Sequence, residues 1–392
     1  MIAYLDHAAT TPLRPEVAEA MQPWLHGRFG NPSGSHSVAR AARQAVDEAR
    51  DVVAAGLGCQ PGEVVFTSGG TEADNLAVAG VVAYRRTLDR GGSPGQSLCS
   101  AIEHHAVLHS VEAVGGHTVA VDGDGVIDLD RLADGLNEEV AVVSVMLANN
   151  EVGTVEPLVD VAEVVRRRAP RAALHTDAVQ AFSWLDVASV CRVADLVSVA
   201  AHKFGGPQGV GALVVRDGIK LEPMMRGGGQ ERERRSGTHN VAGIVGMAAA
   251  VRATVSGRVE TARRVEDLRG RLARGVGGAL AGVVETASGA PRLPNICHLR
   301  IDGIESESLL VLLDQAGLCA SAGSACASGA LEPSHVLSAM GVAPAEARSS
   351  LRLSLGWTST VAEVDAAVSA VVACVERLRG VRGAASLVAG GG

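Results

Sequence analysis

Aromatic side chains are scarce in this 392-residue chain: Phe, Trp and Tyr make up only 2% of it, although 47% of the residues are hydrophobic. The core must therefore be built mainly from Ala, Val and Leu. This composition is typical of a Val-rich parallel sheet covered by Ala-rich helices. A chain of this length can bury a large core, and we expect two domains rather than one.

Other features that the sequence lacks exclude classes of function. No apolar run reaches the roughly 18 residues that a membrane span needs. The N-terminus lacks the basic and apolar stretches of a signal peptide, so we expect a cytoplasmic protein. The net charge of −8 argues against a nucleic-acid-binding surface. The seven cysteines form no CxxC pair and no HExxH pattern occurs, so no metal site is predicted.

Apolar segments of strand length alternate with segments of helical periodicity, which predicts an α/β fold with a parallel or mixed sheet. We expect a helix over 35–56, capped by Ser35 or Ser37, and a long helical zone over 241–280, interrupted near Gly257. Further helices are expected at 71–86 and 159–168, and strands at 63–67, 140–146, 172–176, 196–200 and 210–215. In such sheets, ligands bind at the carboxyl ends of the strands.

Lys203 follows an apolar strand and stands between His202 and a glycine-rich turn. Partial desolvation there favours the neutral amine, which can form a Schiff base with an aldehyde cofactor. Asp177, at the end of an earlier strand, is the acid that such a cofactor needs at its pyridinium nitrogen. The alternative is that Asp177 caps the segment starting at Ala178. Gln180 lies one turn further on, within reach of a phenolic oxygen.

Two glycine-rich segments are candidate phosphate sites. The first, 68–72 (Ser-Gly-Gly-Thr-Glu), opens a helix after a strand, where free backbone amides bind anions. The alternative is an ordinary turn capped by Thr71. The second is 227–238, which is alternatively a flexible surface loop with a solvated run of charges.

Polar residues follow two other strands. His104 is placed to stack on a planar ring or to carry protons near neutral pH. Its alternatives are a capping or solvated histidine, and a zinc ligand that no second motif supports. Asn149 and Asn150 suit a cofactor or substrate contact, or alternatively a simple turn.

The last candidates lie in the C-terminal third. Cys326 stands in a stretch of small residues from 319 to 330 that should be exposed and mobile, and its thiolate would be a strong nucleophile. The alternatives are a disulfide with Cys319, which a reducing compartment disfavours, or an inert cysteine. Arg352 is suited to clamping a carboxylate, or alternatively belongs to a surface ion pair.

Taken in order, these motifs closely resemble the cysteine desulfurases of the NifS/IscS type, in the class V branch of fold-type I pyridoxal-phosphate enzymes. The resemblance runs from 4–11 to 354–356. Intermediate matches are 30–33, 68–72, 103–104, 149–151, 177–180, 202–203 and 227–238. The segment 323–326 followed by 331–334 is similar to the long-loop group I branch.

The resemblance implies a fold and a domain organisation. The large cofactor domain would span 14–256 and contain a mostly parallel seven-stranded sheet. A smaller α/β domain would comprise 1–13 and 257–392 and carry the catalytic-cysteine loop at about 319–332. The active site would lie between the domains and at a dimer interface.

The resemblance also implies how pyridoxal 5′-phosphate is held. Lys203 would form the Schiff base, Asp177 would pair with the ring nitrogen, and His104 would stack on the ring and move protons. Asn150 and Gln180 would hydrogen-bond the hydroxyl group of the cofactor. Gly70, Thr71 and His202 would hold its phosphate. Thr238 would reach the phosphate of the neighbouring subunit, which implies a homodimer.

For the reaction, the resemblance implies that Arg352, with Asn150, binds the carboxylate of L-cysteine. Cys326 would accept the sulfur as a persulfide and leave L-alanine. The sulfur would then pass to an IscU-type iron–sulfur scaffold protein or to an acceptor in thiolation. The alternatives are a class V aminotransferase, a selenocysteine lyase-like enzyme of the same cofactor class, and a relative that has lost its chemistry.

One position departs from the family pattern. The family commonly has serine two residues before the histidine of the His-Lys pair, and here that position is Ala200. Loss of one hydrogen bond to a charged phosphate costs about 1.5–3 kcal/mol of cofactor binding. The departure bears on the phosphate contacts and not on the reaction.

Overall fold

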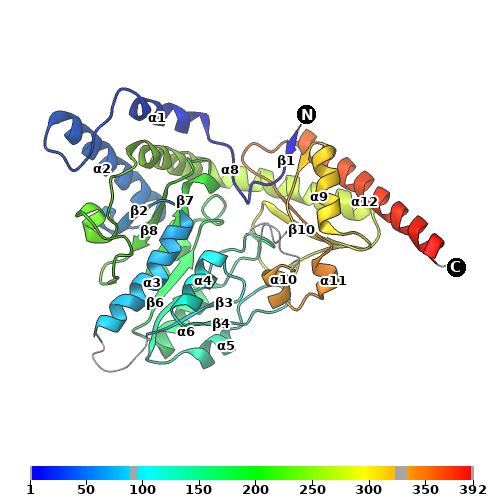
Figure 1. Cartoon of the computed structure of the whole chain (residues 1–392), viewed down its shortest axis with the longest axis horizontal. Coiled ribbons are helices and arrows are strands. Elements are labelled where there is room, and N and C mark those ends of the chain that lie inside the picture. The colour runs from blue at the N-terminus through cyan, green and yellow to red at the C-terminus, as the bar shows by residue number, and fades with distance from the viewer. Residues whose placement is uncertain (1, 89–94, 323–332, 390–392) are drawn as a thin grey trace.

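A seven-stranded sheet with the order β2-β8-β7-β6-β5-β3-β4 lies at the centre of the computed structural model (Figure 1). The structure describes residues 2–88, 95–322 and 333–389, with side chains up to residue 380. The strands are β2 (Val64–Thr67), β3 (Gln96–Ser100), β4 (His117–Val119), β5 (Val140–Ser144), β6 (Ala173–Asp177), β7 (Leu196–Ala200) and β8 (Gly211–Val215). In this sheet β8 is antiparallel to both of its neighbours, β2 and β7, and the other four pairs are parallel. The predicted α/β fold with a mostly parallel seven-stranded sheet is confirmed.

Helices cover both faces of this sheet, because its strands bury side chains on both sides. In β2, Val64 and Phe66 pack into one core cluster and Val65 into another. The first cluster is completed by α2 (Ser37–Leu57), α6 (Leu158–Arg168) and the first half of α8 (Val241–Ala279), and the second by α3 (Gly70–Leu88) and α4 (His105–Ala113). Shorter helices are α1 (Pro15–Leu25), α5 (Leu129–Gly135) and α7 (Val187–Val190).

A second core lies beside the first and joins the two ends of the chain. It is built on an antiparallel sheet of order β12-β10-β9, and β1 pairs in parallel with β11. Leu5 packs there with Leu299 and Leu353. The elements are β1 (Ala3–Tyr4), β9 (Val283–Glu285), β10 (Ile296–Ile301), α9 (Ser306–Gln315), β11 (Leu318–Cys319), α10 (His335–Ala339), α11 (Pro344–Ala347), β12 (Ser350–Ser354) and α12 (Val361–Ala389). The exact domain boundaries stay a prediction.

Helix α8 connects the two cores without a break (Figure 1). The expected interruption near Gly257 is therefore wrong. A glycine within a helix costs about 1 kcal/mol relative to alanine. Packing outweighs that cost, because Met247 and Val251 are buried in the first core and Val265 and Leu272 in the second.

The start of α2 also differs from the prediction. Neither Ser35 nor Ser37 caps this helix. Its N-cap is His36, whose Nδ1 accepts a hydrogen bond from the backbone N–H of Ala39 at 3.2 Å. The helix begins at Ser37, so the residue in the N-cap position is His36. Its imidazole nitrogen accepts the hydrogen bond that a serine hydroxyl was expected to accept.

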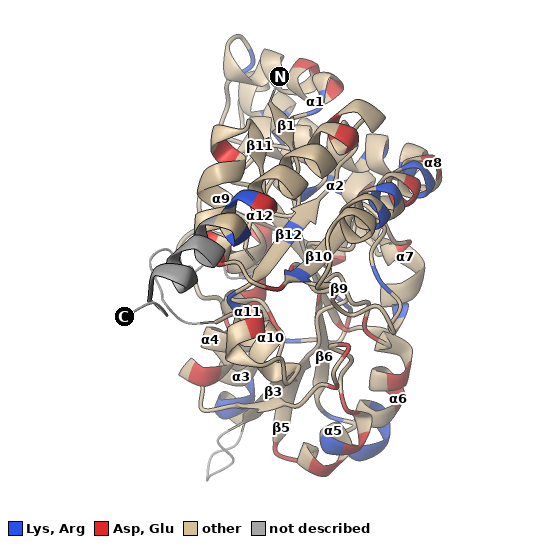
Figure 2. Cartoon of the chain, turned by 90° about the vertical axis from the view of Figure 1, so that its right-hand side faces the viewer, with Lys and Arg blue, Asp and Glu red and all other residues tan. Residues whose placement is uncertain are grey.

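Acidic and basic residues are interspersed along α8 on the face shown in Figure 2. Such interspersed charges are typical of solvated helix faces. In the described part of the chain, the helices are too short or too polar for a membrane crossing.

Candidate functional site

A cavity of about 280 Å³ lies at the carboxyl ends of β6 and β7 and the start of α3. Its walls come from distant parts of the chain, as the fold class predicts for a ligand site. Nine of the predicted residues line it: Gly70, Thr71, His104, Asn150, Asp177, Gln180, His202, Lys203 and Arg352. Ala200, the position of the family departure, lines it too.

Lys203 ends the short helix η3 (Ala201–Lys203), which follows β7 directly. Its Nζ donates hydrogen bonds to the backbone oxygens of Ala8 at 2.6 Å and Ala9 at 2.8 Å. The side chain of Gln180 donates to the same Ala8 oxygen at 2.6 Å. The N-terminal segment thus orients both side chains, a role for Ala8 and Ala9 that sequence reasoning missed because backbone acceptors leave no motif.

Asp177 is the last residue of β6 and is 6% exposed. Its Oδ1 accepts a hydrogen bond from the N–H of Val179 at 2.8 Å, so it also stabilises the following turn, as the capping alternative holds. Burial raises the pKa of Asp177 to about 6, while that N–H and the nearby Lys203 act to lower it. A cationic ligand group in the cavity would therefore stabilise the carboxylate.

Gly70 and Thr71, the first two residues of α3, line the cavity. Gly69 has φ of +158°, and a Cβ on Gly70 would lie 2.9 Å from Cγ2 of Val179, so a side chain there would force a shift. Thr71 lies inside the helix and is not its cap. His202 hydrogen-bonds Thr10 through Nδ1 at 3.2 Å, and burial lowers its pKa to about 4.

His104 is the N-cap of α4, with Nδ1 accepting from the N–H of Ala106 at 3.1 Å. The capping alternative and the place in the cavity are thus both true of this residue. Burial, together with the charge of Lys203, lowers the pKa of His104 to about 4. The imidazole is neutral at pH 7, as a ring that stacks on a cationic ligand should be.

The two asparagines of the 149–151 turn have different positions. Asn149 is fully buried and its Oδ1 accepts from the N–H groups of Glu151 and Val152, which is the turn-forming alternative. Asn150 lines the cavity, and its backbone oxygen accepts from Nη1 of Arg352 at 3.0 Å. A sequence pair that looked uniform thus contains one structural and one cavity residue.

Arg352 projects from β12 and is 3% exposed. Its Nη2 lies 2.8 Å from Oδ1 of Asp6, so it forms an ion pair, although a buried one and not the surface pair considered as an alternative. Among the described residues, its Nε has no hydrogen-bond partner. The guanidinium is therefore held at the cavity with donor capacity left.

Asp74 is a cavity residue that sequence reasoning missed. It lies on α3, one turn after Gly70, and is 1% exposed. The signal that could have found it is a carboxylate among the buried apolar positions of that helix, Ala73, Leu76 and Ala77.

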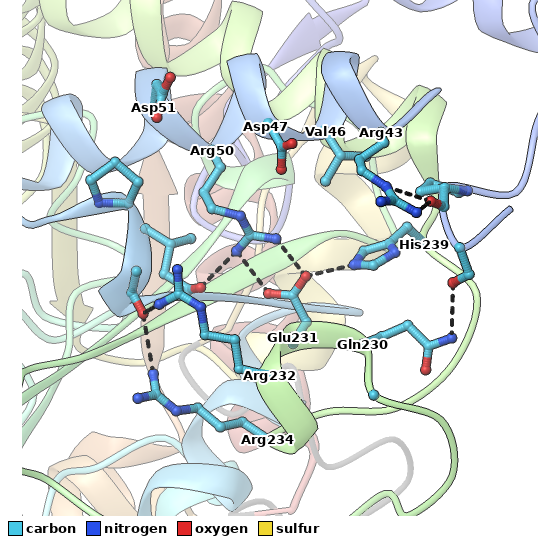
Figure 3. A pocket seen from close by; sticks show the side chains of 16 residues that line it. Arg43, Val46, Asp47, Arg50, Asp51, Gln230, Glu231, Arg232, Arg234 and His239 are labelled. Atoms are coloured by element: carbon cyan, nitrogen blue, oxygen red, sulfur yellow. Dashed lines mark hydrogen bonds and ion pairs between the residues drawn. The ribbon is translucent and has the colours of Figure 1, made fainter. Parts of the chain in front are cut away.

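Thr238 lies outside the cavity and is exposed in this single chain. The segment before it is held by Glu231, whose carboxylate accepts hydrogen bonds from Arg50 and His239 (Figure 3). It also accepts one from the N–H of Phe66. These contacts form one wall of a second cavity of about 620 Å³, between α2 and the turn 229–239.

Arg235 connects this segment to the first cavity. Its Nε lies 2.7 Å from Oε1 of Glu72, whose Oε2 accepts from the N–H of Ser68 at 2.7 Å. The two glycine-rich segments that sequence reasoning singled out are thus neighbours in space.

Cys326 and residues 323–332 of the predicted loop lie outside the described residues. Cys319 is half-buried in β11, and the chain enters the described structure again just before Ser334. Among the described residues, no cluster of His, Cys, Asp and Glu could hold a metal ion.

The cavity residues fit a phosphorylated pyridine aldehyde. An amine, a carboxylate and a neutral imidazole surround one space, and Gly70 and Thr71 at the start of α3 line it too. The amine would bind the aldehyde carbon, the carboxylate would bind the ring nitrogen, and the backbone amides at the start of α3 would bind the phosphate.

Comparison with known proteins gives consistent results. The profile of the family "Aminotransferase class-V" matches residues 3–367. The IscS-like cysteine desulfurase of Mycobacterium tuberculosis is 45% identical over 387 residues, which covers 96% of this chain and 97% of that protein. Cysteine desulfurase IscS of Methanosarcina thermophila is 41% identical, covering 96% of this chain and 92% of that one.

Solved structures show the same similarity. A NifS-like protein superposes with a TM-score of 0.87 and 34% identity, covering 96% of this chain and all of that one. SspA in complex with cysteine superposes with a TM-score of 0.78 and 31% identity, covering 91% of this chain and all of that one.

Proposed function

The chain belongs to the aminotransferase class-V family and is a cysteine desulfurase, and from that premise we propose that its cavity binds pyridoxal 5′-phosphate and L-cysteine. One observation carries the proposal: nine residues predicted from separate motifs line a single cavity. A shared substrate and cofactor site explains why they converge.

In this proposal, each cavity residue has a defined task. Lys203 would hold the cofactor's aldehyde carbon through Nζ and, as a free amine, would take the proton from the substrate Cα. Asp177 holds the ring nitrogen, and His104 covers the ring face. Arg352 binds the substrate carboxylate, with Asn150 beside it. The bound cofactor supplies an electron sink for the charge left at Cα.

The thiol of Cys326 completes the reaction. Its thiolate attacks the substrate sulfur, an S–S bond forms, and the substrate C–S bond breaks. The former substrate takes up protons and leaves as L-alanine, while Cys326 keeps a persulfide. Atoms and electrons balance between a thiol plus L-cysteine and a persulfide plus L-alanine, so the step needs no further oxidant or reductant.

Two variants with one matched control test these roles. Purified protein loaded with pyridoxal 5′-phosphate is mixed with L-cysteine, and alanine and protein-bound persulfide are measured by mass spectrometry. Cys326→Ser should abolish persulfide formation, whereas Cys319→Ser, in the neighbouring strand β11, should retain it. Lys203→Ala should lose both turnover and the visible absorbance of the bound cofactor. Persulfide formation by Cys326→Ser at the wild-type rate would refute the sulfur-acceptor role.

The same assay separates the alternatives. An aminotransferase would need a keto-acid acceptor to consume L-cysteine, and a selenocysteine lyase-like enzyme would prefer selenocysteine. Under the proposal, alanine forms from L-cysteine without added keto acid.

The partners are also part of the proposal. The chain acts as a homodimer in which Thr238 reaches the partner's phosphate site, and this is supported by the exposed position of Thr238 outside the cavity of its own chain. The acceptor of the persulfide is an IscU-type iron–sulfur scaffold or a thiolation protein. Transfer of labelled sulfur to candidate acceptors, with size-exclusion chromatography for the dimer, tests both statements.

A further inference from the structure

A buried polar cluster lies directly beneath the cavity, and the proposed reaction does not use it. We call it the Asp74 cluster: Asp74 of α3, Ser144 of β5, His175 of β6 and Ser198 of β7. The two serines and the histidine are fully buried, and Asp74 is 1% exposed while also lining the cavity. Polar groups in such positions are retained only when their hydrogen bonds and charges are balanced.

His175 organises the cluster. Its Nδ1 lies 2.8 Å from Oγ of Ser144, and its Nε2 lies 2.9 Å from Oγ of Ser198. Complete burial lowers the pKa of His175 to about 3, so the ring is neutral at pH 7. The cluster therefore has no histidine cation that could balance a charge on Asp74.

The surroundings of Asp74 offer little stabilisation to a charged carboxylate. Its Oδ1 lies 3.6 Å from Nε2 of His175, which is beyond hydrogen-bonding distance. Within the described part of the chain, this oxygen has no hydrogen-bond partner. Burial and the charge of Asp177 raise the pKa of Asp74 well above its usual range, and a hydrogen bond with Ser198 only partly opposes this.

Asp177 has what Asp74 lacks. It accepts the N–H of Val179 at 2.8 Å and is attracted by Lys203. Two neighbouring buried carboxyls cannot both ionise cheaply, so the negative charge settles on the better-stabilised one. Glu103, in the turn after β3, interacts electrostatically with both carboxyls. It is fully buried, and burial raises its pKa well above the usual range.

We propose that Asp74 is a positioning residue that stays neutral within the Asp74 cluster and so leaves Asp177 as the single negative charge facing a pyridinium nitrogen. The inference rests on the proposed function, because Asp177 needs a cationic ring as its partner. One carboxylate under one ring cation gives a neutral pair, whereas a second buried anion would remain uncompensated.

Cofactor binding tests the charge on Asp74. Asp74→Asn keeps the shape and the neutral state, so its dissociation constant for pyridoxal 5′-phosphate should stay within about threefold of wild type. Asp74→Ala removes the contact with Ser198 and should weaken binding roughly ten- to a hundredfold. The pH midpoint of the visible absorbance of the bound cofactor should be the same in wild type and Asp74→Asn. A shift of about one pH unit or more in Asp74→Asn overturns the proposal, because it shows that a charge was removed.

Infrared difference spectroscopy on the cofactor-free protein provides a readout that does not depend on activity. At neutral pH, the wild type should show the carbonyl stretching band of a protonated carboxyl that Asp74→Asn lacks. Glu103→Gln is the matched control, because it removes a different buried carboxyl and should leave the Asp74 band in place. Loss of a carboxylate band in Asp74→Asn instead would refute the proposal. If wild type failed to bind pyridoxal 5′-phosphate, the proposed function would fall, while the infrared result would still decide the protonation of Asp74.

Discussion

Glu231→Gln should destabilise the protein by about 3 kcal/mol at neutral pH. Glu231 is 7% exposed, and its carboxylate accepts hydrogen bonds from Arg50 and His239 (Figure 3) and from the N–H of Phe66. Burial alone would raise its pKa, but the hydrogen bonds with His239 and Arg50 prevail and lower it to about 2. The difference between about 2 and the ordinary 4.5 corresponds to about 3 kcal/mol.

The local backbone explains why the hydrogen bonds of the Glu231 carboxylate are needed. Glu231, Arg232 and Glu233 have φ values of +47°, +57° and +66°, and each non-glycine residue in this region costs roughly 1–2 kcal/mol. The hydrogen bonds of Glu231 help to offset that strain and hold the segment that leads to Arg235. A glutamine can accept one hydrogen bond from Arg50 but cannot supply the charge.

The assay is urea unfolding followed by tryptophan fluorescence. Glu233→Gln is the matched control, because Glu233 lies in the same turn, is exposed, and should change stability by less than about 0.5 kcal/mol. The folded-state pKa of Glu231 lies below its unfolded value, so its stabilisation is present above about pH 4.5 and is lost as the pH falls toward about 2. The difference in the free energy of unfolding between wild type and Glu231→Gln should therefore shrink as the pH falls. A loss below about 1 kcal/mol at pH 7, or a gap independent of pH, would refute the reasoning.

Three further predictions concern the cavity and its surroundings. Arg352→Lys should raise KM for L-cysteine about tenfold or more with a smaller change in kcat, because an ammonium cannot hold Asp6, the Asn150 carbonyl and a carboxylate together. Arg300→Lys on β10 is the control. An unchanged KM in Arg352→Lys would contradict the role of Arg352 in binding the substrate carboxylate. Burial raises the pKa of Glu151 to about 7, so the folded protein holds a proton that the unfolded chain releases between about pH 4.5 and 7. The free energy of unfolding of the wild type should therefore fall by about 3 kcal/mol over that range, and this fall should be absent in Glu151→Gln. Melting temperatures across that range measure the effect, and parallel curves for the two proteins would argue against it. Ala200→Ser should tighten pyridoxal 5′-phosphate binding roughly ten- to a hundredfold, by giving the phosphate a hydroxyl donor at a position that lines the cavity. Equal or weaker binding in equilibrium dialysis would show that the hydroxyl does not reach the phosphate.

Much of the site could be predicted from the sequence because it depends on local order along the chain. Lys203 follows β7, Asp177 ends β6, and the turn 68–70 precedes α3, as their flanking patterns predict. In a parallel sheet these strand ends meet at one edge, so local assignments were enough to bring the residues together. The resemblance to cysteine desulfurases added their roles.

Other features depend on contacts between distant segments, which no local pattern encodes. The amine of Lys203 is held by backbone oxygens at Ala8 and Ala9, about 195 residues away along the chain. Likewise, helix α8 continues through Gly257 because two separate cores bury its two halves. Local propensity favours a break there, and tertiary packing outweighs it.

The sequence by itself therefore determined the α/β fold class, a parallel or mixed sheet and the set of candidate site residues, since these follow from periodicity and residue type. Only the tertiary structure decided the electrostatic state of those side chains. Burial and neighbouring charges set the pKa of Asp177, His104 and Glu231, and the sequence reveals neither. The physical reason is that charge stability depends on the distance to partners and to water, which exists only once the chain has folded.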